Sequence, residues 1–304
     1  MPLAATPVRD ALDSAMIPLT AAGCENPRLD AEVLLAAALG ISRLELVTDS
    51  RREIAGAQAR VFMDFVRRRR NREPVAYITG RKGFRHIELA VDRRVLIPRP
   101  ETEFVVEAAL GLPDRARVVD VGTGSGAIAL ALKQERPDLD VVATDVSEDA
   151  LDVARLNALR LGLDVAFVAG DLWAGVEADA IVSNPPYVES TARLMPDVAQ
   201  FEPHGALFAG EDGLDVIRRL VAAPVAFLAL EHGMGQADAI ETLLREAGFD
   251  EVSRVRDFAG IERVAVARRE SPAASGEGAA TDGAAAGGEA AASRGAATGG
   301  EGAA

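Results

Sequence analysis

Residues 118–126 read Val-Val-Asp-Val-Gly-Thr-Gly-Ser-Gly, and this stretch decides the fold of the chain. The apolar start predicts a short buried strand, the glycines predict a tight turn, and the apolar pattern of residues 127–133 predicts a helix. A strand, a glycine turn and a helix in this order let a ligand lie against bare backbone at a helix N-terminus, although glycines also serve ordinary turns. The residues predicted to hold a cofactor here are Gly122, Thr123, Gly124, Ser125 and Gly126.

The spacing of the glycines and the strand that follows narrow the choice of cofactor. The turn reads G-x-G-x-G and not the G-x-G-x-x-G of pyrophosphate-binding folds, which favours a ligand with adenosine but no phosphates. The predicted strand 141–144 ends at Asp145, where a carboxylate would hold a ribose diol. Asp145 also suits the start of a helix at residues 148–161, and Asp120 suits either a cap of the glycine turn or a cofactor contact.

A second motif, Asn184-Pro185-Pro186-Tyr187, follows the apolar run 178–183. Two prolines cannot donate backbone hydrogen bonds, so they end the strand abruptly and fix the carbonyls around them. The Asn184 side-chain oxygen and the Pro185 carbonyl then form a rigid pair of acceptors beside the ring of Tyr187. A planar –NH2 group fits this corner, which predicts a site that binds and alkylates an amide or a base amine. All four residues are predicted to bind the substrate, with Asn184, Pro185 and Tyr187 as the catalytic set.

The chain divides into segments of different composition. Strands and helices alternate from Arg117 onward, which predicts a mostly parallel α/β sheet with helices on both faces, within a catalytic domain at residues 96–270. Before it, residues 1–79 predict a small helical domain and residues 80–95 predict a β-hairpin linker. Residues 271–304 contain no large apolar side chain, which predicts a disordered tail.

The apolar patterns also predict the individual elements. The predicted helices are 30–39, a second one from 61 to 70, and then 127–133, 148–161, 214–222 and 237–247. The predicted strands are 118–121, 141–144, 165–169, 180–183 and 225–230, followed by 252–258 and 262–267 as a terminal antiparallel hairpin.

With Leu-Ile-Pro-Arg-Pro-Glu-Thr-Glu at residues 96–103, the two motifs make the chain similar to class I S-adenosylmethionine-dependent methyltransferases. More narrowly, it resembles the peptide chain release factor N5-glutamine methyltransferase family, from the N-terminal helices to about Arg269. The resemblance implies a Rossmann-like seven-stranded sheet, with S-adenosyl-L-methionine as cofactor and S-adenosyl-L-homocysteine as product. It also implies that the substrate is the glutamine of the Gly-Gly-Gln motif in class 1 release factors, recognised by the helical domain.

The resemblance suggests roles for further residues. Trp173, the only tryptophan, is expected in the adenine pocket, with ordinary packing as the alternative. Asn184 is expected to contact the cofactor as well as the substrate. Glu101 and Glu103, behind Pro100, are interpreted as acids of a first helical turn, with a part in closing the active site as the alternative.

Composition limits the partners and the chemistry. A net charge of −14 argues against a protein that grips a nucleic-acid backbone. One cysteine, Cys24, and three scattered histidines predict neither a disulfide framework nor a metal site. The apolar runs are too short for a bilayer and no basic signal region precedes them, so we expect a cytoplasmic protein. A monomer is expected, although no sequence feature determines the oligomeric state.

Other functions stay open from the sequence alone. The Asn-Pro-Pro-Tyr motif also suits an amino-methyltransferase acting on adenine or cytosine in nucleic acid, and a glutamine of a ribosomal protein is an alternative substrate. A non-catalytic binding protein on the same scaffold is a third alternative, although such a protein would be expected to have lost one of the motifs. The basic run 67–70 with Arg72 is interpreted either as a solvated helix end or as a docking patch for an acidic protein partner.

Overall fold

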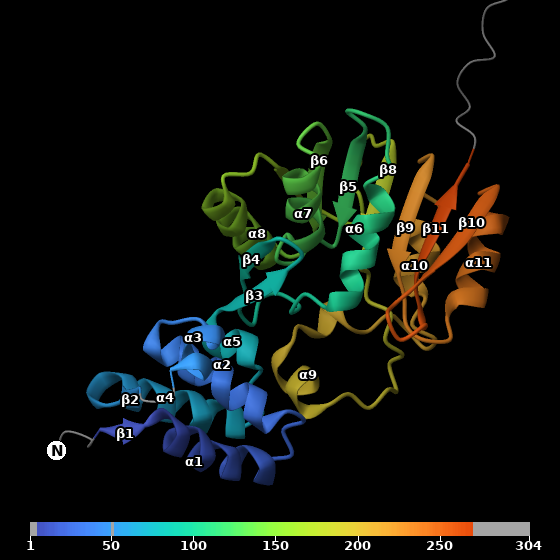
Figure 1. The fold of residues 1–304 in the computed structure, drawn as a ribbon. Helices are drawn as coiled ribbons and strands as arrows, with labels where there is room; N and C mark the ends of the chain where they lie inside the picture. Colours follow the sequence, from blue (N-terminus) through green and yellow to red (C-terminus); the bar gives the residue numbers. More distant parts are fainter. Residues whose placement is uncertain (1–4, 50–51, 270–304) are drawn as a thin grey trace, which may run out of the picture. The chain divides into compact units, whose positions relative to one another are not determined.

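The computed structural model describes residues 5–49 and 52–269, in the elements labelled in Figure 1. Residues 271–304, for which the sequence predicts disorder, lie outside the described residues. That expectation therefore stays a prediction.

Short helices form most of the chain before residue 80, as the sequence predicts. The helices are α1 (Val8–Ala21), α2 (Pro27–Leu39), α3 (Arg43–Thr48), α4 (Gly56–Arg70) and α5 (Val75–Thr79). Two short strands, β1 (Thr6–Pro7) and β2 (Glu53–Ile54), pair with each other. Helix α2 starts with Pro27 in its first turn and ends at Gly40, whose φ of 69° is the left-handed conformation common at helix ends. The fully buried Leu19, Leu34 and Leu35 lie in the core that α1, α2 and α4 share.

The hairpin expected at residues 80–95 is present as the antiparallel strands β3 (Arg81–Phe84) and β4 (Ile87–Ala90). Asn157 of helix α8 (Glu148–Leu161) holds it in place. The Asn157 Oδ1 accepts from the Ala90 amide at 2.7 Å, and Nδ2 donates to the Ala90 carbonyl at 3.0 Å and the Ser125 carbonyl at 2.9 Å. One buried side chain thus joins the hairpin to the glycine turn.

The described chain after the hairpin is built around a seven-stranded sheet. Its strand order is β10-β11-β9-β8-β5-β6-β7. Its strands are β5 (Arg117–Val121), β6 (Asp140–Asp145), β7 (Ala166–Ala169), β8 (Ala180–Ser183), β9 (Phe227–Glu231), β10 (Glu251–Arg256) and β11 (Glu262–Arg268). Strands β9, β8, β5, β6 and β7 are parallel, and β10 and β11 form the antiparallel terminal hairpin. The predicted fold class and the predicted strands are confirmed.

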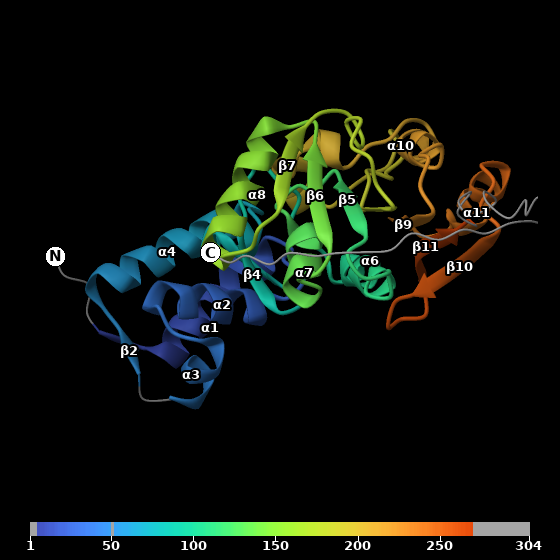
Figure 2. The same cartoon turned by 90° about the horizontal axis from the view of Figure 1, so that it is seen from above.

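Helices cover both faces of this sheet. Successive side chains along a strand point to opposite faces, and the apolar side chains on both faces are buried under helices. The further helices are η1 (Pro100–Thr102), α6 (Glu103–Ala109), α7 (Ala127–Glu135), α9 (Pro196–Phe201), η2 (His204–Ala206), α10 (Asp215–Leu220) and α11 (Ala237–Glu246). Val118 packs in the core with α6, α7 and α8, whereas its neighbour Val119 packs in the core with α10 and α11. Figure 2 shows α6 and α7 on one side of the strands and α10 and α11 on the other.

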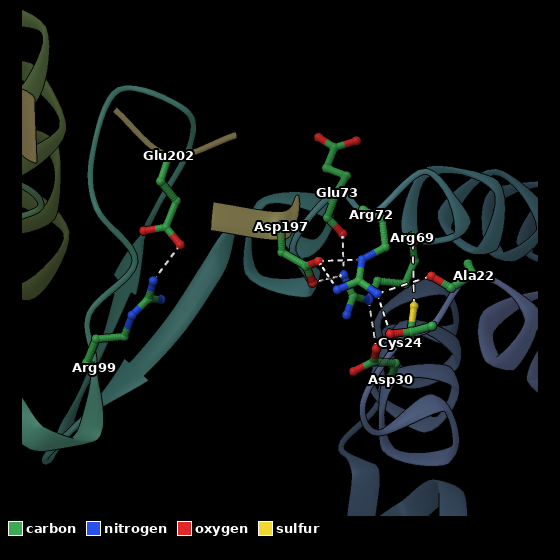
Figure 3. A network of polar contacts seen from close by, with 10 residues as sticks. Ala22, Cys24, Asp30, Arg69, Arg72, Glu73, Arg99, Asp197 and Glu202 are labelled. Carbon is green, nitrogen blue, oxygen red and sulfur yellow. Dashed lines mark hydrogen bonds and ion pairs between the residues drawn. The ribbon is translucent and has the colours of Figure 1, made fainter. Parts of the chain in front are cut away.

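An ion-pair cluster joins α4 to α9, which follows the Asn-Pro-Pro-Tyr motif in the chain (Figure 3). The Arg69 side chain is only 8% exposed and donates to Asp30 Oδ2 at 2.7 Å and to Asp197 Oδ2 at 2.6 Å. Arg72 donates to the other oxygen of Asp197. The interpretation of this basic run as a solvated helix end is therefore wrong for Arg69 and Arg72. They bind acids of their own chain, because the helix end is packed against α2 and α9.

Candidate active site

A pocket of about 260 Å³ opens at the carboxyl ends of β5, β6 and β8. Strand order reverses here, since β5 lies between β6 and β8, and ligands of open α/β sheets bind at such a reversal. The pocket is lined by six of the residues singled out from the sequence, namely Gly122, Gly124, Asp145, Asn184, Pro185 and Pro186. The topology thus brings the two sequence motifs together in one cavity.

The glycine turn forms the first wall of the pocket. Gly122, Gly124 and Gly126 have φ values of 71°, 56° and 84°, a region that other residues rarely adopt. A Cβ at Gly122 or Gly124 would meet nothing within 4 Å, so bare backbone faces open space there. A Cβ at Gly126 would instead lie 2.9 Å from Leu130 Cδ1, which keeps α7 close to the turn.

The other residues of the turn hold its shape and do not line the pocket. Thr123 and Ser125 are buried, and the amides of Gly122 and Thr123 both donate to the Thr144 carbonyl at 2.9 Å. These bonds tie the turn to the neighbouring strand β6. A cofactor contact of Thr123, Ser125 or Gly126 therefore stays a prediction.

Asp145 lies at the end of β6, on the pocket, and its carboxylate also organises the backbone. Oδ2 accepts from the Gly124 amide at 2.9 Å and Oδ1 accepts from the Ser147 amide at 2.9 Å. The two roles open from the sequence are compatible, because each carboxylate oxygen can accept a second hydrogen bond. Asp145 thus orders the backbone that leads into α8, whose N-cap is Ser147, and it also lines the pocket. Its contact with a ribose diol stays a prediction.

Asp120 is fully buried beneath the glycine turn. Its Oδ2 accepts from Thr123 Oγ1 at 2.6 Å and from the Ala129 amide at 3.1 Å, whereas Oδ1 has no hydrogen-bond partner among the described residues. Burial raises the pKa of the Asp120 carboxyl to about 7. Of its two roles left open by the sequence, the structure supports the cap of the turn.

The Asn-Pro-Pro-Tyr corner forms the second wall. Asn184 follows strand β8, and its Nδ2 donates to Thr102 Oγ1 at 3.0 Å. Thr102 in turn donates to Glu231 Oε2 at 2.6 Å, and the Tyr187 hydroxyl donates to Glu231 Oε1 at 3.0 Å. Four residues from three distant parts of the chain therefore form one connected polar network.

Burial controls the electrostatics of this network. Glu231 is 1% exposed, and burial raises the pKa of its carboxyl to about 7 against the lowering effect of the hydrogen bonds from Thr102 and Tyr187. Burial, and then the charge of Glu231, raise the pKa of the Tyr187 hydroxyl above its usual range. Tyr187 therefore acts as a hydrogen-bond donor at neutral pH.

Neither Tyr187 nor Trp173 lines the pocket itself. The Tyr187 hydroxyl is held by Glu231 and its carbonyl accepts from Gln236 Nε2 at 3.1 Å. Trp173 packs against the core that contains α10 and α11, and Asp171 and Leu172 line the pocket at this point. Contacts of Tyr187 with the substrate and of Trp173 with adenine stay predictions.

Thr102 and Glu231 are the site residues that the sequence reasoning missed. Thr102 lies in the motif at residues 96–103, where only its neighbours Glu101 and Glu103 were considered. Those two acids lie at the start of η1 and α6, and Glu103 Oε1 accepts from the Arg85 amide at 3.0 Å. Glu231 had a usable signal, since it follows the buried strand residues as Asp145 does.

No group of His, Cys, Asp and Glu side chains in residues 5–49 and 52–269 is arranged to hold a metal ion. Within the same residues, no helix has the length and apolar character to cross a membrane.

Comparison with known proteins identifies relatives along almost the whole described chain. Residues 10–80 match the family model "PrmC N-terminal domain" and residues 102–201 match "Methyltransferase small domain". A protein of Xylella fastidiosa named release factor glutamine methyltransferase is 45% identical over 264 residues, which are 82% of this chain and 96% of that protein. A protein of Caulobacter vibrioides with the same name is 41% identical over 271 residues, which are 83% of this chain and 94% of that protein.

One solved structure shows a similar fold at low sequence identity. The hMettl16 catalytic domain, in complex with a MAT2A 3′UTR hairpin, is 18% identical with a TM-score of 0.50. The match covers 60% of this chain and 77% of that one. At this identity the similarity concerns the fold alone.

Proposed function

Because this chain belongs to the release factor glutamine methyltransferase family, we propose that it methylates a glutamine side chain in class 1 peptide chain release factors. The methyl group goes from S-adenosyl-L-methionine to the amide nitrogen N5 of the glutamine in the Gly-Gly-Gln motif. The observation that carries the proposal is the carboxamide of Asn184 on the rim of the pocket that the glycine turn also lines.

The first wall suits the cofactor. S-adenosyl-L-methionine supplies a sulfonium-bound, already activated methyl group, so the chemistry requires no metal. The open space above Gly122 and Gly124 admits a ligand against the backbone, and the Asp145 carboxylate on the same wall can accept from a ribose diol. On this wall, Gly122, Gly124 and Asp145 would hold the adenosine part of the cofactor.

The second wall suits the substrate amide. An amide nitrogen is a poor nucleophile because its lone pair is delocalised into the carbonyl. The Asn184 oxygen and the Pro185 carbonyl accept its two N–H groups in our proposal, which leaves the lone pair exposed. These acceptors stabilise the positive charge that develops on the nitrogen more than they stabilise the neutral amide. Positioning contributes the remainder, and the product nitrogen loses its extra proton readily without a strong base.

Successive segments of the chain are proposed to have different roles. We propose that residues 1–79 recognise the release factor, that residues 80–95 link them to the rest, and that residues 96–270 hold both ligands. The helical segment coincides closely with the matched "PrmC N-terminal domain" at residues 10–80. The acidic net charge of −14 favours a protein substrate over nucleic acid.

The test is direct. The purified protein is incubated with labelled S-adenosyl-L-methionine and a class 1 release factor, a ribosomal protein fraction, or DNA and RNA in parallel. We expect label on the release factor alone, on the motif glutamine by mass spectrometry, and none on a release factor whose motif glutamine is replaced by alanine. Label on nucleic acid or on a ribosomal protein in preference to the release factor would refute the proposal.

A further inference from the structure

A buried chain of hydrogen bonds runs from Asn184 away from the pocket. Asn184 Nδ2 donates to Thr102 Oγ1 at 3.0 Å, and Thr102 Oγ1 donates to Glu231 Oε2 at 2.6 Å. Thr102 is 4% exposed and Glu231 is 1% exposed, so no solvent competes for these bonds. The chain crosses from β8 to η1 and on to the end of β9.

The donors and acceptors of this chain allow one direction only while Glu231 is ionised. A carboxylate is an acceptor only, so Thr102 must give it its single hydroxyl proton. The Thr102 oxygen can then only accept from Asn184, and the group that donates to it must be the –NH2 of the carboxamide. The two ends of an amide are nearly alike in shape, so the hydrogen-bond network decides which end points where.

We propose that Thr102 and Glu231 are positioning residues that orient the Asn184 carboxamide with its oxygen toward the substrate. This inference rests on the proposed function, in which the substrate presents an –NH2 group to that oxygen. With the opposite orientation, two –NH2 groups would face one another and the substrate would lose an acceptor. These two hydrogen bonds, from Asn184 to Thr102 and from Thr102 to Glu231, are called the relay below. The relay fixes the Asn184 oxygen as an acceptor toward the pocket before the substrate binds.

Tyr187 completes the relay from the other side. Its hydroxyl donates to the second oxygen of Glu231 at 3.0 Å, so both oxygens of the carboxylate are engaged by donors. Among the charged groups that act on Glu231 are Glu101, which opposes its ionisation, and Arg263 on β11, which favours it. Tyr187 therefore helps to orient the Asn184 carboxamide of its own motif, through Glu231 and Thr102. The two prolines of the motif add stiffness to the backbone.

The test uses three substitutions that separate hydrogen bonding from shape. Thr102→Val keeps the volume but cannot accept from Asn184, whereas Thr102→Ser keeps the hydroxyl. Glu231→Gln presents an amide, which can either donate to Thr102 or accept from it, so the hydrogen bonds can run in either direction. We expect Thr102→Val and Glu231→Gln to lower kcat by roughly 10- to 100-fold on a release factor, with the KM for S-adenosyl-L-methionine within about twofold of the unaltered protein. Thr102→Ser should restore kcat to within about threefold.

A matched control makes the same chemical change elsewhere. Thr79→Val on α5 removes a hydroxyl that donates to the Val75 carbonyl at 3.0 Å, and it should leave kcat unchanged. Thermal unfolding and calorimetric cofactor binding show whether each variant is folded. A Thr102→Val protein that is folded, binds cofactor and keeps kcat within about twofold would overturn the inference.

A spectroscopic readout keeps the inference testable without turnover. The chain has four asparagines, so the side-chain resonances of ¹⁵N-Asn protein can be assigned by single substitutions. We expect the Asn184 –NH2 protons to exchange slowly in the unaltered protein and in Thr102→Ser, and fast in Thr102→Val. Equal exchange in all three would refute the relay even if the enzyme is active. Failure of the unaltered protein to methylate a release factor would instead refute the proposed function.

Discussion

The two walls of the pocket are built in opposite ways. The glycine turn is local: residues 122–126 and the end of the adjacent strand supply bare backbone, and their geometry follows from three positive φ angles. The Asn184 wall is assembled from side chains of η1, β8 and β9, which are far apart in the chain and meet only because the sheet brings them together. In our proposal, the first wall therefore binds the cofactor mainly by its shape, whereas the second wall binds the substrate by the direction of its hydrogen bonds.

Removing the acceptor on the second wall should give the largest effect. Asn184→Ala deletes the oxygen proposed to bind the substrate amide, so we expect kcat to fall on the order of 10³-fold. The Kd for S-adenosyl-L-methionine, measured by calorimetry, should stay within about threefold because the first wall is untouched. Near-normal turnover by this variant would show that the walls do not divide the work in this way.

A change confined to the first wall should have the complementary effect. Gly124→Ala forces a side chain into a φ of 56°, which should cost about 1–2 kcal/mol of stability. Its methyl group would also enter the open space proposed for the ligand, and this crowding should weaken cofactor binding by roughly 5- to 30-fold. At saturating cofactor, kcat should change little. Gly40→Ala is the matched control, since Gly40 has a φ of 69° and equally open space but ends α2. The control should lose similar stability and no cofactor affinity.

The pH dependence distinguishes the walls because each contains a buried carboxyl with a pKa of about 7, Asp120 in the first and Glu231 in the second. Protonated Glu231 would donate to Thr102 and reverse the relay, so kcat should fall as the pH drops through about 7. Glu231→Gln should abolish this dependence, whereas Asp120→Asn should keep it. A Glu231→Gln profile that still falls near pH 7 would assign the dependence to another group.

Stability should respond to pH with the opposite sign. The pKa of Glu231 is raised in the folded protein, so its contribution to stability is present below its unfolded pKa of about 4.5 and is lost as the pH rises through about 7. The unfolding free energy of the unaltered protein relative to Glu231→Gln should therefore decrease by up to about 3 kcal/mol between these two pH values. Denaturant titrations of both proteins at a series of pH values measure this difference. The unfolding free energy of the unaltered protein relative to Asp120→Asn should also decrease as the pH rises, because the pKa of Asp120 is raised in the folded protein as well.

The smallest expected effect is a fluorescence change of Trp173, the only tryptophan. It packs next to Leu172, which lines the pocket near the first wall, so cofactor binding should alter its emission modestly. Titration with S-adenosyl-L-homocysteine tests this. A flat titration under conditions where calorimetry detects binding would remove Trp173 from the adenine site.

The first wall, at the glycine turn, was predictable from the sequence. The second wall, at Asn184, was predictable only in part. The strand at 118–121, the glycine turn and Asp145 follow from short-range patterns, because a buried strand and a left-handed turn each restrict the residues at fixed positions. Asn184 was predictable for the same reason, since two prolines follow it. Its partners Thr102 and Glu231 were not, because no spacing rule relates residues that meet only through the order of strands in a sheet.

The helix ends show the same limit. The alternatives considered for Arg69 and Arg72 were solvent or an external acidic partner, because composition reveals only that a helix end is basic. Their actual partner, Asp197, is distant in sequence and is selected by packing. Charge patterns therefore predict that a partner exists more readily than which residue it is.

The ion pairs of Asp197 have a mechanical consequence. The segment that leaves the Asn184 corner is anchored at its far end by two arginines of the helical region, and the Asp197 side chain is only 20% exposed. Pairs that are this well shielded resist added salt far better than surface pairs do. The helical region and the segment that follows the Asn184 corner should therefore stay joined even at ionic strengths that dissolve ordinary surface contacts.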